Sequence, residues 1–336
     1  MLVGTDGARR MLGVVTDGSL RNALPPRDGF RELPVTAATA SNHDRPVLLV
    51  RSPSSRADRA LRLCSVAVAA WLLGTVVPVV HYARETGGVA PVIAHVFAAV
   101  AVVVVLIRDV RAPQLLRDWL PLASVPFLYL EARWPIAGLG RPHADAAIHA
   151  WELAIFPSDP SRALAVRFHS APLSEVLHAA YLSYYALIYL PPLVLYVRGR
   201  REEFAETNLA LAVAFAMCFT SFLVFPVDGP RFMTGAAAAP DGPIRTLTLA
   251  LLNGASTRGT AFPSLHVAAS VVASACALRF VRPLGYGLLP ITVALMIATV
   301  YGGFHYAVDV WAGVLVGAVS LCAVRLLWTQ IKPSSP

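Results

Sequence analysis

The sequence predicts an all-α polytopic membrane protein, a helical bundle of about eight transmembrane helices. Of its 336 residues, 56% are hydrophobic and only 14% are charged, whereas a soluble domain carries about 25% charged residues. The mean hydropathy is +0.60. The charge is also segregated, since long stretches carry none and arginines gather between them. These three features are typical of helical membrane proteins.

The N-terminal residues 1–60 are predicted to form a basic, disordered cytoplasmic tail. They are rich in Arg, Asp, Gly, Pro and Ser and show no sustained apolar periodicity. No apolar run follows Arg9-Arg10, so we expect no signal peptide. Ten arginines lie between Arg9 and Arg62, ahead of the first apolar segment. This excess of positive charge favours a cytoplasmic N-terminus.

Apolar segments fill the rest of the chain, and most reach the ~20 residues needed to cross a bilayer. We expect accessory transmembrane helices in 61–135 and a second membrane domain in 136–330. Arg117 and Asp118 interrupt the third segment, a pattern also typical of a re-entrant or interfacial helix. Residues 145–172 are expected to form short interfacial helices. The predicted spans are approximately 61–82, 89–107, 114–131, 174–197, 206–225, 261–279, 284–300 and 305–328.

The arginines predict how these spans are oriented. Eight crossings place both termini and the dense cluster at 198–201 in the cytoplasm, as the positive-inside rule requires. Arg231, His266 and His305 then share the extracytoplasmic face of what we expect to be the plasma membrane. The net charge of +8 is almost entirely arginine in short loops and the tail, so we expect no nucleic-acid partner. The four cysteines lie in apolar segments without metal-ligand spacing, and we assign them no function.

His305 and Asp309 are the first candidate catalytic residues. Four residues apart at the start of a helix, they share a face, with Cβ atoms about 5–6 Å apart. The carboxylate can fix the imidazole tautomer and leave the second ring nitrogen free to attack phosphorus, forming a phosphohistidine. The ordinary structural alternative is that Asp309 caps the helix and His305 is an interfacial polar residue.

The segment Pro263-Ser264-Leu265-His266 supplies the second candidate group. Pro263 suits the first position of a helix, and the N–H groups that follow it would form an anion site. Ser264 adds a hydroxyl that could bind the substrate phosphate, and His266 can protonate a departing alkoxide. Alternatively, Pro-Ser merely starts a span and His266 lies among lipid headgroups.

Arg231 follows the fifth span in a turn bracketed by Pro226, Gly229 and Pro230. Its guanidinium suits bidentate contact with phosphate oxygens, although a headgroup contact would explain it equally well. Arg245 and Arg258 lie in the same loop and could assist, but solvated loop charge is the favoured interpretation for both.

The order and spacing of these elements resemble the type 2 phosphatidic acid phosphatase superfamily. Its pattern is Lys-x6-Arg-Pro, then Pro-Ser-Gly-His, then Ser-Arg-x5-His-x3-Asp. Residues 263–266 match the second element with Leu265 in place of glycine, and residues 299–309 match the spacing of the third. The resemblance covers about 145–328 and implies a phosphatidic acid phosphatase type 2-like catalytic core within 136–330. It implies His305 as nucleophile, Asp309 as its orienting group, His266 at the leaving group, and no metal or other cofactor.

Two cations of the family pattern are missing. The lysine of the first element falls at Val224 and its proline at Phe232, and Ala298-Thr299 replaces the Ser-Arg of the third. This argues against vanadate haloperoxidase chemistry, which depends on a dense cationic cage. The reduced pattern is similar to the inositol phosphorylceramide synthase branch, an inositolphosphotransferase that moves a phospholipid headgroup onto a lipid alcohol. A phosphodiester carries less charge than a monoester, so fewer cations are needed to hold it.

The resemblance therefore implies a membrane enzyme that acts on a phospholipid or polyprenyl phosphate through phosphohistidine, with water or a lipid alcohol as acceptor. A strict lipid phosphate monoester phosphatase is one alternative. A transporter is another, but it would carry ionisable residues deep within its spans, and the later spans have almost none at their centres. Metal-dependent hydrolysis by His266, His305 and Asp309 is a third, against which the family resemblance argues. The oligomeric state is not predicted.

Overall fold

The computed structural model of the protein describes residues 3–5, 11–13, 55–107, 113–233 and 239–331, which fall into two compact units, 1–50 and 51–336. In the first unit, β1 (Val3–Thr5) pairs antiparallel with β2 (Met11–Gly13), with Gly4 opposite Leu12. Apart from these strands and residues 55–60, the predicted disordered tail lies outside the described residues.

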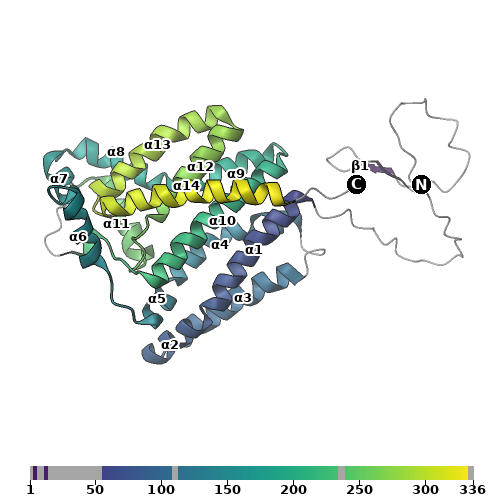
Figure 1. Cartoon of the computed structure of the whole chain (residues 1–336), viewed down its shortest axis with the longest axis horizontal. Coiled ribbons are helices and arrows are strands. Elements are labelled where there is room, and N and C mark those ends of the chain that lie inside the picture. The colour runs from purple at the N-terminus through teal and green to yellow at the C-terminus, as the bar shows by residue number, and fades with distance from the viewer. Residues whose placement is uncertain (1–2, 6–10, 14–54, 108–112, 234–238, 332–336) are drawn as a thin grey trace, which may run out of the picture. The chain divides into compact units, whose positions relative to one another are not determined.

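The second unit is built mainly of helices in its described part (Figure 1). Its N-terminal helices are α1 (Arg56–Gly74), α2 (Val76–Thr86), α3 (Ala90–Ile107), α4 (Gln114–Glu131) and α5 (Arg133–Leu139). Short helices α6 (Asp145–Ile155) and α7 (Pro160–Arg167) follow. The remaining elements are α8 (Ala171–Leu182), α9 (Tyr184–Val197), α10 (Arg201–Val224), the 3₁₀ turn η2 (Pro230–Phe232), α11 (Pro243–Ala255), α12 (Leu265–Phe280), α13 (Arg282–Tyr301) and α14 (Ala307–Gln330).

Helices occupy all eight predicted spans, but the structure does not give eight independent crossings. Four described helices (α3, α10, α13 and α14) are long and apolar enough to cross a membrane. The number rises to six if the bent pairs α1–α2 and α8–α9, broken by 40° and 42°, each form one span. The predicted spans at α4 and α12 lie outside this set, so the count of eight stays a prediction. The chain is an integral membrane protein with four to six candidate spans.

Charged residues, buried ones among them, lower the mean hydropathy of α4. Asp118 is only 1% exposed, and its Oδ1 lies 2.7 Å from Nη2 of Arg201 at the start of α10. Arg201 also pairs with Asp58 of α1 at 2.9 Å. Because Arg201 bridges Asp118 and Asp58, it ties α4 to α1 and α10 despite the polar residues of α4.

Hydrogen bonds between distant segments define a basic end of the bundle. Arg56 Nε donates to the Ile331 carbonyl at 2.8 Å, which joins the start of α1 to the end of α14. Arg200 Nη1 donates to the Phe280 carbonyl at 2.6 Å, which joins the start of α10 to the end of α12. His305 lies just before α14 and His266 at the start of α12, and both are therefore at the opposite end.

Helix α14 lies alongside α12 and α10 in the second half of the chain (Figure 1). Two glycines permit its close approach to α12. A Cβ at Gly313 would lie 2.6 Å from the Ser264 carbonyl oxygen, and one at Gly317 would lie 3.0 Å from that of Ala268. These small residues set the beginnings of α12 and α14 against each other, which brings the segments of His266 and His305 together.

Candidate active site

His305 lies in the tight turn between α13 and α14. Gly303 has a φ of 69°, which favours glycine, and the Phe304 and His305 N–H groups both donate to the Thr299 carbonyl at 2.9 and 3.0 Å. The His305 side chain is buried, and its Nδ1 lies 2.9 Å from the carbonyl oxygen of Ala261. A carbonyl can only accept, so this contact requires the hydrogen on Nδ1 and leaves the Nε2 lone pair free.

Asp309 contributes both as a helix cap and as a neighbour of His305. Its Oδ2 accepts the Tyr306 N–H at 2.9 Å and lies 3.4 Å from His305 Nδ1. The ordinary alternative from the sequence, an N-terminal helix cap, is therefore present together with the carboxylate–imidazole contact. Asp309 is fully buried, and its main-chain carbonyl accepts the Ser264 N–H at 3.0 Å, which ties α14 to α12.

His266 faces His305 across a small gap, with ring centroids 5.7 Å apart. Its Nε2 lies 3.3 Å from the Tyr181 hydroxyl, and its ring packs on Tyr184 with centroids 4.4 Å apart. Tyrosines of α8 and α9 therefore orient this imidazole. A ring so placed can exchange a proton with a group bound between the two histidines.

The start of α12 differs from its predicted form. Pro263 is not the first helical residue, since the helix begins at Leu265 and Ser264 is its N-cap. The Ser264 hydroxyl is buried and accepts the Val267 N–H at 3.4 Å. The main-chain N–H of Ser264 donates to the Asp309 carbonyl. In the described structure Ser264 positions the helix that carries His266 and does not line the cavity between the histidines. Its contact with a phosphate stays a prediction.

Arg231 is held at this site by its loop. Gly229, with a φ of 98°, lies so close to the next turn that a Cβ would come within 2.7 Å of the Phe304 carbonyl oxygen. The Gly229 N–H donates to the Asp145 carboxylate at 2.9 Å, and the Arg231 N–H donates to the Gly303 carbonyl at 2.9 Å. The Arg231 guanidinium donates to the Ser256 hydroxyl, and burial lowers its pKa from the usual value.

The two histidines and Arg231 line one cavity of about 30 Å³, together with hydroxyl groups that the sequence did not single out. Tyr129 comes from α4, and its hydroxyl lies 3.2 Å from that of Thr260. Nothing in the sequence around Tyr129 signals this role, because its helix is distant in the chain and lies outside the motifs that contain the histidines. The described polar residues lining the cavity are Tyr129, Tyr181, Asp228, Arg231, Ser256, Thr257, Thr260, His266 and His305.

The other two arginines considered from the sequence both have carboxylate partners. Arg258 is largely exposed, as a solvated loop charge is, whereas Arg245 lies on α11 and its side chain is only 14% exposed. Arg258 Nε lies 2.9 Å from Asp228 Oδ2, and Arg245 contacts Asp241. The guanidiniums of Arg231 and Arg258 both lie over the ring of Phe232, at 4.4 and 5.1 Å from its centroid. Phe232 therefore replaces the proline of the family pattern with a ring that orients Arg231.

Glu152 of α6 is a second buried acid near the catalytic turn, and the sequence did not identify it. It is 0% exposed, and its Oε1 accepts the Ala307 N–H at 2.5 Å at the start of α14. Burial raises the pKa of this carboxyl to about 7, and the neighbouring Asp159 and Asp309 charges act in the same direction. The sequence showed Glu152 only as a lone acid on an apolar helix.

A model of the PAP2 superfamily matches residues 146–323, which is more than half of the chain. The chain belongs to the PAP2 superfamily. The match contains His266, His305, Asp309 and Arg231 and begins within α6, so α1 to α5 lie outside it. A search of curated proteins and a search of solved structures each gave no match. Membership supports an enzyme of the phosphatase or phosphotransferase kind.

The structure shows where the PAP2 cations missing from this chain would have been. Val224, at the lysine position, is 60% exposed at the end of α10. Thr299, at the arginine position, is fully buried, and its hydroxyl donates to the Met296 carbonyl at 2.7 Å. Neither side chain lines the cavity, so Arg231 is the one cation among the described residues that does.

His143, Asp145 and Asp228 form a group that could hold a metal ion, since their ligand atoms all lie within 4.8 Å of one another. No other such group of three or more is found among the described residues of this PAP2 protein. The group differs from the His266, His305 and Asp309 set considered from the sequence. Both carboxylates already bind protein groups. Asp228 contacts His143 Nδ1 at 2.8 Å as well as Arg258, and Asp145 accepts the Asp228 N–H at 3.0 Å. This group fixes the Arg231 loop.

Proposed function

We propose that the protein transfers a phosphoryl headgroup from a lipid-linked phosphate ester through a phosphohistidine on His305. The donor is a phosphodiester phospholipid, and the acceptor is a lipid alcohol or water, as in an inositol phosphorylceramide synthase-like enzyme. No cofactor or metal takes part. A phosphatase restricted to lipid phosphate monoesters is the alternative.

One observation carries the proposal. The Ala261 carbonyl, 2.9 Å from His305 Nδ1, holds the ring as the tautomer whose Nε2 can attack. Asp309 at 3.4 Å can stabilise the positive charge that the ring gains. His266, with its ring centroid 5.7 Å from that of His305, can serve the opposite side of a bound phosphate.

The reaction has two displacements. In the first, Nε2 of His305 forms a bond to phosphorus while the bond to the lipid oxygen breaks, and protonated His266 gives its proton to that oxygen. In the second, neutral His266 takes the proton of the acceptor hydroxyl as its oxygen attacks phosphorus, and His305 leaves. Both imidazoles return to their starting state. Arg231 stabilises charge on the phosphate oxygens in both displacements.

The polar lining of the cavity supports a diester donor. A single guanidinium faces neutral hydroxyls such as those of Tyr129, Tyr181 and Thr260. Hydroxyl groups donate hydrogen bonds to phosphate oxygens without adding charge. A bound diester carries one negative charge, which Arg231 alone can balance, whereas the second charge of a monoester dianion would have to be balanced by the protonated His266 that the leaving oxygen also needs.

We further propose that both termini are cytoplasmic in an eight-span arrangement and that the site opens to the extracytoplasmic face of the plasma membrane. The separation of the basic end, near Arg56 and Arg200, from the histidines supports this orientation.

A trapping experiment tests the nucleophile. Purified protein is incubated with a donor labelled at phosphorus and quenched in alkali, in which phosphohistidine survives. Wild type and the control His81→Ala, an exposed histidine of α2, should retain label, and His305→Ala should retain none. Equal label on His305→Ala would refute the proposed nucleophile.

A donor panel with and without an added lipid alcohol tests the substrate class. We expect phosphodiester donors to be consumed in preference to phosphatidate and polyprenyl phosphates, with headgroup transfer when alcohol is present. Preference for phosphatidate would favour the monoester alternative. Activity lost in EDTA and restored by a divalent cation would contradict metal independence.

A further inference from the structure

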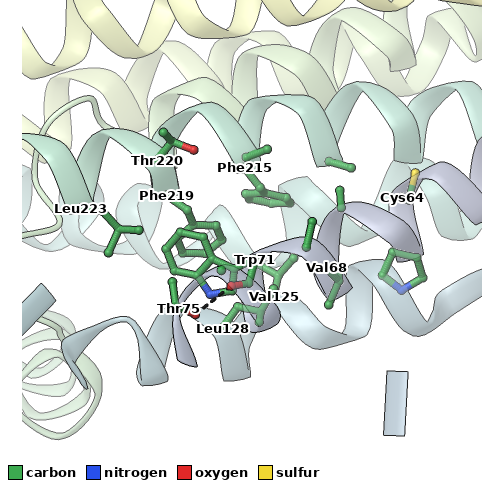
Figure 2. A pocket seen from close by; sticks show the side chains of 16 residues that line it. Cys64, Val68, Trp71, Thr75, Val125, Leu128, Phe215, Phe219, Thr220 and Leu223 are labelled. Carbon is green, nitrogen blue, oxygen red and sulfur yellow. Dashed lines mark hydrogen bonds between the residues drawn. The ribbon is translucent and has the colours of Figure 1, made fainter. Parts of the chain in front are cut away.

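A second cavity, of about 400 Å³, lies between α1, α4 and α10, away from the histidines (Figure 2). Its walls are almost entirely hydrocarbon. The polar groups of Trp71 and Thr75 are satisfied within the protein, since the Trp71 indole N–H donates to Glu131 at 2.9 Å and the Thr75 hydroxyl donates to the Trp71 carbonyl at 2.7 Å. We call this cavity the α1/α4/α10 groove; its walls include Val68, Trp71, Val125, Leu128, Phe219 and Leu223.

The dimensions of the groove match one lipid leaflet. Along α10 it extends from Ala212 to Leu223, a rise of about 16 Å at ~1.5 Å per residue. Half of a hydrocarbon core of about 30 Å is about 15 Å. The groove is therefore as deep as one leaflet of acyl chain.

Small residues keep the groove open toward lipid. Ala67, Ala70 and Gly74 of α1 and Ala216 of α10 line it and are exposed. A Cβ at Gly74 would meet nothing within 4 Å. Because no large side chain covers these positions, a chain can enter sideways from the membrane.

The groove and the catalytic cavity share one helix, α4. Leu128 of α4 lines the groove, and the next residue, Tyr129, lines the cavity of His266 and His305. The Thr257 hydroxyl donates to the Tyr129 carbonyl at 3.1 Å, so the end of α4 is fixed to the catalytic loop. A lipid with its phosphate at His305 could therefore lay a chain along α4 and α10.

We propose that the α1/α4/α10 groove binds one hydrocarbon chain of the lipid substrate whose phosphate reacts at His305. The inference rests on the proposed function. It gives the accessory helices α1 and α4, which lie outside the PAP2 match, a role in recognising that chain. The occupant is an acyl or alkyl chain, because the walls offer packing contacts and no charged partner.

Chain-length dependence tests the proposal. Ala67→Phe and Ala216→Phe fill the groove from opposite walls, and Val66→Phe adds the same ring at an exposed position of α1 outside it. With a long-chain donor, we expect the groove variants to raise KM at least ~10-fold. That is a change of ~1.4 kcal/mol, less than two buried methylenes contribute. With a short-chain donor of the same headgroup, KM should stay within about 2-fold of wild type, as it should for Val66→Phe on both donors. Equal effects on both donors, or an unchanged KM on the long one, would overturn the proposal.

A binding measurement separates this proposal from the proposed function. Lipid brominated on its acyl chain should quench Trp71 fluorescence, isolated as the difference between wild type and Trp71→Phe, and Ala216→Phe should abolish that quenching. Undiminished quenching in Ala216→Phe refutes the groove even if catalysis proceeds as proposed. If donor without bromine does not reduce the quenching, the groove holds a bulk lipid and the substrate role is refuted. If wild type consumes no donor but quenching is displaced by it, the groove is supported and the proposed reaction fails.

Discussion

The substitution Asp309→Asn distinguishes two ways of holding the nucleophile. In the structure, His305 Nδ1 is closer to the Ala261 carbonyl, at 2.9 Å, than to Asp309 Oδ2, at 3.4 Å. The carbonyl accepts and cannot donate, so it keeps the hydrogen on Nδ1 when the carboxylate becomes an amide. The amide oxygen of the variant side chain can still accept the Tyr306 N–H, which preserves the helix cap.

The expected loss is therefore one of charge alone. Two unit charges 3.4 Å apart interact by about 5 kcal/mol at an effective dielectric constant of about 20. If about half of the positive charge has developed on the imidazole in the transition state, roughly 2–3 kcal/mol is lost. This corresponds to a decrease in kcat of about 10²-fold. In the Ser-His-Asp triad, where the carboxylate sets the tautomer, the same substitution costs about 10⁴-fold.

Single-turnover formation of the labelled enzyme measures this step directly, with thermal unfolding as a check on folding. Asp309→Ala should be similarly slow and also less stable, because it loses the acceptor for the Tyr306 N–H. A decrease of 10⁴-fold or more in stable Asp309→Asn would mean that the carboxylate, not the Ala261 carbonyl, sets the tautomer. A decrease smaller than about 3-fold would leave Asp309 as a helix cap only.

Three further substitutions test other parts of the site. Arg231→Lys keeps the charge but loses the planar fork, so kcat/KM should fall about 10–100-fold. Arg84→Lys, at an exposed position of α2, should change kcat/KM by less than about 3-fold, and equal effects of the two substitutions would contradict the assignment. Burial raises the pKa of Glu152 from 4.5 to about 7. The contribution of Glu152 to the stability of wild type should therefore be largest below about pH 4.5. About 3 kcal/mol of the free energy of unfolding should be lost as the pH rises from 4.5 through 7. Glu152→Gln should remove that slope in thermal unfolding, and an unchanged slope would place the titration elsewhere. Gly313→Ala brings a Cβ within 2.6 Å of the Ser264 carbonyl oxygen and should cost about 1–3 kcal/mol, while Gly287→Ala, where nothing lies within 4 Å, should not destabilise; similar melting temperatures for the two variants would contradict the close approach of α14 to α12.

The parts of the site that were predictable from the sequence are local ones. His305 and Asp309 are four residues apart in the chain, and their side chains do lie together, 3.4 Å apart, although His305 lies in the turn before α14 and not on the helix face that the spacing predicted. The even number of crossings between His266 and His305 predicted a shared membrane face, and the two rings line one cavity. Their chemical roles stay predictions until the variants are measured.

The contacts that the sequence did not predict join segments distant in the chain. A backbone carbonyl such as that of Ala261 has no signature in side-chain patterns, yet it is the nearest acceptor to His305. Glu152 binds the start of α14 across 155 positions. Pro263 was expected to begin α12, but the Ser264 N–H bonds to Asp309 and the helix begins after it. Tertiary contacts override local propensity at each of these points.

The low hydropathy of α4 has a tertiary explanation as well, and α4 links the two halves of the protein. Its Asp118 lowers the apolar content of the segment, but the partner that neutralises it, Arg201, is 83 positions away. At the other end of the helix, Leu128 lines the groove and Tyr129 lines the catalytic cavity. Thr299 is buried and does not line the catalytic cavity, whereas Tyr129 does. At this wall of the cavity the accessory helix α4 therefore supplies a neutral hydroxyl group, and our proposal of a donor lipid with a single negative charge rests on that neutral lining.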